Sequence, residues 1–148
     1  MGGHPYFYSV DFEPDANAAL QKLRRREFAA GRYNPVVMFP EFPITEETPA
    51  PGAQHGSIED ALEASAEDGT RSILDLMKVA DEPDFCVAAR LSADELIDLF
   101  GTDRPTEELV QEHFDELLEP IERGQGICFA IYKGDQPSEW IFAGYSFD

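Results

Sequence analysis

The sequence Ile-Cys-Phe-Ala-Ile-Tyr at 127–132 is followed by Lys-Gly-Asp-Gln-Pro-Ser at 133–138 and by Glu-Trp-Ile-Phe-Ala-Gly-Tyr-Ser-Phe at 139–147. The outer segments are rich in the aromatic and β-branched residues that favour strands. The middle segment has the Gly, Asp, Pro and Ser that favour a turn. We therefore predict a β-hairpin at the carboxyl end of the chain.

Two helices are predicted before this hairpin. Ser92 and Glu95 have the spacing of a capping box, apolar residues follow, and Gly101 stands where a helix ends. The residues at 103–105 predict the start of a second helix, at roughly 106–122, where apolar residues recur every three or four positions. His113 lies on or beside this apolar stripe, which indicates a packed structural histidine, with a metal ligand or a general base as the alternatives.

The amino-terminal part predicts a strand and two further helices. Residues 5–12 alternate with aromatic side chains on one side, which is typical of a strand. A helix follows at 15–30, with Pro14 at a plausible first helical position and Gly31 at the expected left-handed cap. Ser57 resembles the N-cap of another helix, which we expect to end near residue 66.

Three segments leave alternatives open. Residues 36–39 fit either a short strand or an ordered loop. Residues 42–56 contain prolines and glycines without an apolar period, which indicates a functional or mobile loop. Residues 70–79 fit a helix or a strand, and we favour a strand that forms a β-hairpin with 85–91.

The order of these elements lacks the regular strand–helix alternation of a parallel nucleotide-binding sheet. We expect a single α+β domain over residues 1–148, with a mainly antiparallel sheet, about four helices and the terminal hairpin. The length of 148 residues suits one core.

Charge excludes several classes of partner. Lys and Arg number 11 against 30 Asp and Glu, so the formal charge is -19. Such a chain repels nucleic acid and anionic membranes. We expect a cytoplasmic protein, because the sequence has neither a bilayer-length apolar run nor the basic start and apolar stretch of a secretory signal. Positive charge gathers around Arg24–Arg26, which we interpret as salt-bridging residues, with an anion site as the alternative.

The predicted acidic helix places carboxylates opposite its apolar stripe. This face is either a solvated surface or a docking surface for a basic protein. Our first functional hypothesis is a protein-interaction or regulatory module that binds a basic partner. The analogy, which rests on charge alone, is with small acidic proteins that inhibit basic toxins or nucleases. The candidate contact residues are Glu108, Glu112, Asp115, Glu116 and Glu119.

The alternative hypothesis is a small-molecule or anion site, with or without catalysis. It uses the guanidinium groups of Arg32 and Arg71, the phenol of Tyr33, and His55 and Ser57 at the predicted helix start. This hypothesis requires Arg32 and His55 to lie on the same side of the sheet.

No cofactor motif or metal-ligand spacing occurs, so we predict neither a cofactor nor a metal. Cys86 and Cys128 lie in apolar runs and are interpreted as buried free thiols, with an inter-strand disulfide or a reactive thiol as alternatives. A third hypothesis, compatible with either function, is homo-oligomerisation through the aromatic edge of the hairpin around Trp140, Phe142 and Tyr145.

Overall fold

The computed structural model describes residues 3–37 and 46–147, and the strands in these ranges form one five-stranded sheet in the order β1-β5-β4-β3-β2. The strands are β1 (Pro5–Asp11), β2 (Lys78–Ala80), β3 (Val87–Arg90), β4 (Gly126–Lys133) and β5 (Gln136–Tyr145). The long strands β1, β5 and β4 pair antiparallel, whereas the short strands β2 and β3 add parallel pairs. The predicted α+β class is confirmed, and antiparallel pairing dominates without being complete.

The terminal hairpin is confirmed. β4 and β5 pair antiparallel with Cys128 opposite Phe142, and a tight turn at Gly134 joins them. Because β1 pairs along the other side of β5, β5 lies inside the sheet. Trp140 and Phe142 are buried, so the proposed oligomer contact through the hairpin edge is wrong for these residues.

The second predicted hairpin is wrong. β2 and β3 run parallel, with Lys78 opposite Val87. Residues 73–75 form a 3-10 helix. After β2 the chain at 81–86 runs back to the end at which β2 began, and β3 starts there in the same direction. Cys86 ends this return with a left-handed backbone (φ 64°), a geometry that alternation of side chains does not predict.

Five α-helices are present in the described ranges, compared with the four or so expected. They are α1 (Ala16–Ala30), α2 (Ile58–Ala64), α3 (Ala93–Phe100), α4 (Glu107–Glu112) and α5 (Phe114–Leu118). Asp15 caps α1 by accepting from the amides of Asn17 and Ala18, and Gly31 ends it with φ 77°. Pro14 therefore precedes the cap and does not occupy the first helical position.

The predicted single acidic helix is divided at His113. This residue has φ -108° and ψ 21°, and it separates α4 from α5. Its ring packs edge-on against Phe100, and its Nδ1 lies 3.2 Å from Glu116 Oε2. Val110 before the break and Leu117 after it both belong to the same core.

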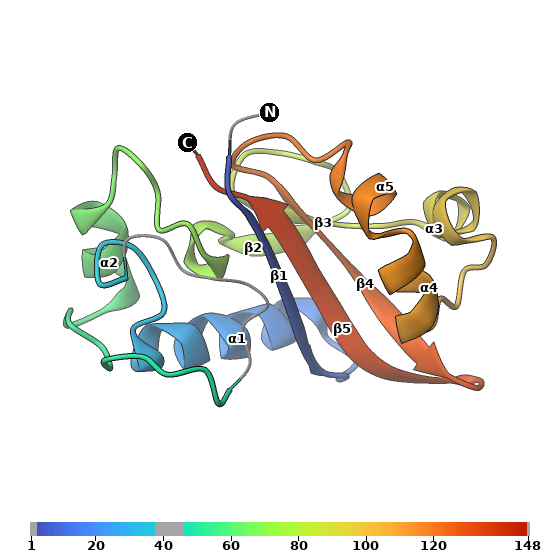
Figure 1. Ribbon diagram of the computed structural model, residues 1–148, viewed down its shortest axis with the longest axis horizontal. Helices are drawn as coiled ribbons and strands as arrows, with labels where there is room; N and C mark the ends of the chain where they lie inside the picture. The colour runs from blue at the N-terminus through green and yellow to red at the C-terminus, as the bar shows by residue number, and fades with distance from the viewer. Residues whose placement is uncertain (1–2, 38–45, 148) are drawn as a thin grey trace.

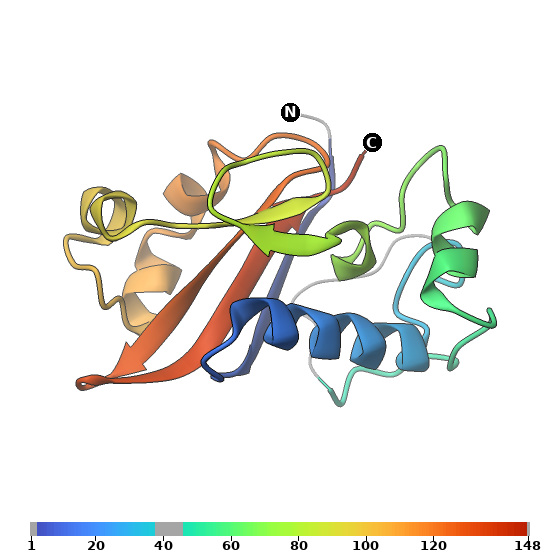
Figure 2. The ribbon, with the colours of Figure 1, turned by 180° about the vertical axis from the view of Figure 1, so that it is seen from behind.

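The sheet is covered on both faces. Figure 1 shows α4 and α5 in front of the sheet, and Figure 2 shows α1 across the opposite face. One core packs Leu20, Leu23 and Trp140 between α1 and the sheet, and another packs Leu96 and Phe129 beneath α3 and α5. These two cores fix which strand residues can face the candidate site.

The remaining segments complete the description. Val36 and Val37 lie in a turn and bend, while 38–45, which include parts of the predicted 36–39 and 42–56 segments, lie outside the described residues. The predicted helix start at Ser57 is confirmed by its hydrogen bond from Asp60. None of the described helices is long and apolar enough to cross a membrane.

Candidate functional site

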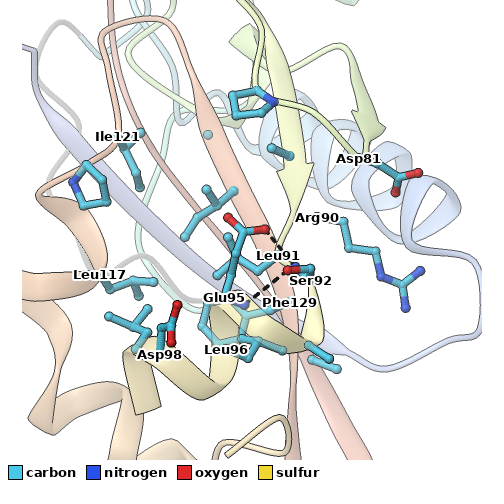
Figure 3. A pocket seen from close by; sticks show the side chains of 18 of the residues that line it. Asp81, Arg90, Leu91, Ser92, Glu95, Leu96, Asp98, Leu117, Ile121 and Phe129 are labelled. Atoms are coloured by element: carbon cyan, nitrogen blue, oxygen red, sulfur yellow. Dashed lines mark hydrogen bonds between the residues drawn. The ribbon is translucent and has the colours of Figure 1, made fainter. Parts of the chain in front are cut away.

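A groove of about 1140 Å³ lies beside the parallel strands, between α3 and the segment containing α5. Its floor is apolar and comes from four different elements (Figure 3). Leu91 follows β3, Leu96 belongs to α3, Phe129 to β4, and Leu117 and Ile121 to α5 and the turn after it. Leu91 and Ile121 stay partly exposed, so an apolar ligand would remove further apolar surface from water.

The rim of the groove is acidic. Its carboxylates are Asp81, Glu82, Glu95, Asp98, Asp103 and Glu116, all on exposed residues. Carboxylates gathered around an apolar floor create a negative potential that favours cationic groups. The groove therefore has the chemistry to hold a segment that combines apolar and basic side chains.

Arg90 is the one basic residue among those that line the groove in the described part of the chain. Its guanidinium lies over the ring of Trp140, 5.0 Å from the centroid, and extends away from the apolar floor (Figure 3). Trp140 itself is fixed by its indole N–H, which donates to the carbonyl of Glu13 at 2.7 Å. The positive charge thus lies on the face opposite to Leu117 and Phe129.

The capping box predicted from the sequence shapes this groove. The Ser92 hydroxyl accepts from the Glu95 amide, and Glu95 accepts in return from the Ser92 amide at 3.0 Å. The box starts α3 two residues after β3 ends, so the chain leaves the sheet there. Asp98 and Asp103 follow on exposed surface beside the opening.

The predicted acidic face of α4 and α5 continues the negative surface. Its five predicted contact residues are all exposed, and they are Glu108, Glu112, Asp115, Glu116 and Glu119. Glu116 also lines the groove, so it joins the two surfaces. The remaining groove residues were not predicted, because they come together only through the pairing of β3 with β4.

Arg32 of the alternative site is buried in a structural network. Its guanidinium donates to Glu27 Oε2 at 2.7 Å and to the carbonyls of Glu46 and Thr48 at 2.8 and 3.1 Å. Glu27 is fully buried and also accepts from Arg26 Nε at 2.8 Å. Arg32 therefore anchors the 46–48 segment to the end of α1, and an external anion would have to compete with Glu27.

The other residues of the alternative site are only partly brought together. Tyr33 Oη lies 2.9 Å from His55 Nδ1, and burial raises the pKa of the Tyr33 phenol. The loop bearing His55 is fastened to the end of α1, close to Arg32 in sequence, through the Gly52 amide. Ser57 serves as the cap of α2, and Arg71 is buried with φ 52°. The anion-site hypothesis stays a prediction.

Two of the three consecutive arginines have structural contacts. Arg24 is buried and donates to the Leu74 carbonyl at 3.1 Å, and its burial lowers the pKa of the guanidinium. Arg26 forms the ion pair with Glu27, as the salt-bridge interpretation predicted for this run. Arg25 is exposed.

Both cysteines are free thiols. Cys128 is buried, and its burial raises the pKa of the thiol to about 12, whereas Cys86 is half-buried. Within residues 3–37 and 46–147, no three His, Cys, Asp or Glu side chains are arranged to hold a metal ion. Comparisons with family models, curated proteins and solved structures found no match.

Proposed function

We propose that this protein is a cytoplasmic protein-interaction module that binds a basic segment of a partner protein. The observation that carries the proposal is the groove, in which an apolar floor is surrounded by carboxylates. The floor supplies a hydrophobic contact and the rim supplies charge complementarity, the two components of specific protein interfaces.

The overall charge supports the same partner. A chain of net charge -19 attracts a basic partner over a distance of about 8 to 10 Å at physiological salt. The exposed carboxylates of α4 and α5 lie next to the rim, and Glu116 belongs to both. We infer that this helical face guides the encounter and that the groove holds the bound segment.

Selection from a phage-displayed library of random twelve-residue peptides tests this function directly. We expect the selected peptides to be enriched in Lys, Arg and apolar residues, and their affinity to fall as salt is added. The dissociation constant of the best peptide is then measured by calorimetry against two double variants. Asp98→Lys with Asp103→Lys reverses the charge at two positions of the rim. The control, Glu63→Lys with Glu67→Lys, makes the same change in net charge on exposed residues at and after the end of α2.

We expect the rim variant to bind about tenfold more weakly, because each reversal replaces an attraction with a repulsion at the contact. The control should stay within about twofold of the unmodified protein, because screened charges distant from the groove contribute little. Equal losses in both variants, or selected peptides without basic enrichment, would contradict the proposed function.

The Tyr33–His55 contact favours the alternative function, a site for a small anionic molecule. A thermal-shift screen of phosphorylated metabolites and carboxylic acids at matched ionic strength tests it. A specific ligand should raise the melting temperature by several degrees at a hundred times its dissociation constant. His55→Ala should abolish that shift, and a shift retained in this variant would exclude the contact as the site.

A further inference from the structure

One edge of β4 is open inside the groove. β4 extends over Gly126–Lys133, but its ladder with β3 covers only 126–128. At the far end of the strand, the amide of Tyr132 donates to the carbonyl of Pro105 at 2.9 Å. Between these two attachments the chain leaves the sheet to form α3, so no strand of the described chain pairs with this edge of β4 at 129–131.

The exposed hydrogen-bonding groups in this window belong to Ala130. The amide and carbonyl of one strand residue point to the same side, and the side alternates along the strand. The Cys128 carbonyl accepts from the Leu91 amide at 3.0 Å, and Tyr132 bonds to Pro105 on the same side. Ala130 lies between them and so faces the same side, where no backbone hydrogen bond joins it to another described residue.

The groove reaches this window from both faces of the sheet. Phe129 lines it from the face that carries α3 and α5, while Ala130 and Trp140 line it from the face that carries α1. Ala130 is partly exposed, and Leu91 and Ser92, where the chain leaves the side of β4, also line the groove. The open amide and carbonyl of Ala130 are therefore accessible from the groove.

We propose that the partner segment binds in an extended conformation and pairs with Ala130 by strand addition. This inference rests on the proposed function and specifies how the groove holds its ligand. The backbone of one partner residue donates to the Ala130 carbonyl and accepts from the Ala130 amide. Strand addition of this kind supplies affinity through main-chain bonds and specificity through alternate side chains.

The two faces of the sheet then fix the sequence pattern of the partner. The residue opposite Ala130 directs its side chain toward the face with Arg90 and Trp140, so a basic side chain is disfavoured there. Its two neighbours point to the other face, toward Phe129 and the rim carboxylates of α3 and α5. The expected pattern is an acidic or small residue between residues that are apolar or basic.

The test uses the best peptide from the random library with the unmodified, isotope-labelled protein. In the free protein, the Ala130 amide should exchange with solvent faster than the Phe129 amide, which faces β5. Bound peptide should slow the exchange of the Ala130 amide at least tenfold. N-methylation of the peptide residue opposite Ala130 should weaken binding about tenfold, because it removes a hydrogen bond and adds a steric obstacle. The matched control carries the N-methyl group on the next residue, whose amide points away from β4.

The outcomes separate the two proposals. A peptide that binds with the expected dependence on Asp98 and Asp103 but leaves Ala130 exchange unchanged overturns strand addition and leaves the proposed function standing. Equal effects of the two N-methyl positions, or bound peptides that are helical, also overturn strand addition. A library that yields no binder overturns both.

Discussion

Replacing Glu27 with glutamine tests whether the buried charge network holds the end of α1 to the 46–48 segment. The Glu27 carboxylate is fully buried and accepts from Arg26 and Arg32 at 2.8 and 2.7 Å. Arg26 can turn toward water because its side chain is 23% exposed, whereas Arg32 is only 7% exposed. The variant therefore leaves chiefly one buried cation without its counter-charge, which costs about 3 to 5 kcal/mol.

Urea unfolding followed by circular dichroism measures this cost. A loss of that size corresponds to a fall in melting temperature of about 6 to 20 °C for a chain of this length. Glu63→Gln, on the exposed side of α2, should change the free energy of unfolding by less than about 0.5 kcal/mol.

A double-mutant cycle separates the charge interaction from the loss of other contacts. Arg32→Met removes the buried cation, so Glu27→Gln should cost less in its presence, with a coupling of about 2 kcal/mol. A loss of less than about 1 kcal/mol in the free energy of unfolding for Glu27→Gln alone, or additive effects in the cycle, would refute the reasoning. Either result would show that this ion pair does not hold the 46–48 segment to the end of α1.

Four further predictions follow from local geometry. At pH 8, Cys86 should react with a thiol reagent well before Cys128, as mass spectrometry would show, and equal rates would contradict the burial of Cys128. The native pKa of the Cys128 thiol is about 12 against an ordinary 9.0, so this thiol loses its proton at lower pH in the unfolded state than in the folded state. The free energy of unfolding should therefore fall as pH rises from 9.0 toward 12, and a flat profile would contradict this sign. Gly124→Ala should cost about 1 to 2 kcal/mol in urea unfolding, because Gly124 has φ 73° and a Cβ there would meet the ring of Phe85. Ser92→Ala should cost about 1 kcal/mol by removing the cap of α3, and an unchanged stability would argue against the capping box.

Local chemistry explains the elements that could be predicted from the sequence. Helix caps act within a few residues, so Gly31 and the Ser92–Glu95 box could be recognised from spacing alone, whereas the N-cap of α1 is Asp15 and follows the Pro14 that was expected inside the helix. The hairpin of β4 and β5 was equally recognisable, because turn residues and alternating side chains set its register. The exposed carboxylates of the acidic helices also followed from their spacing opposite the apolar stripe.

The sequence by itself determined the α+β class, the main helix ends, the terminal hairpin and the acidic character of the surface, because each depends on neighbouring residues or on composition. Only the tertiary structure decided that β2 and β3 run parallel, that the acidic helix breaks at His113, and that an apolar groove opens beside β4. Strand direction and the open edge at Ala130 depend on which segments far apart in the sequence pair with each other. The hydrophobic effect drives this pairing, but it is non-directional and does not distinguish a parallel from an antiparallel strand.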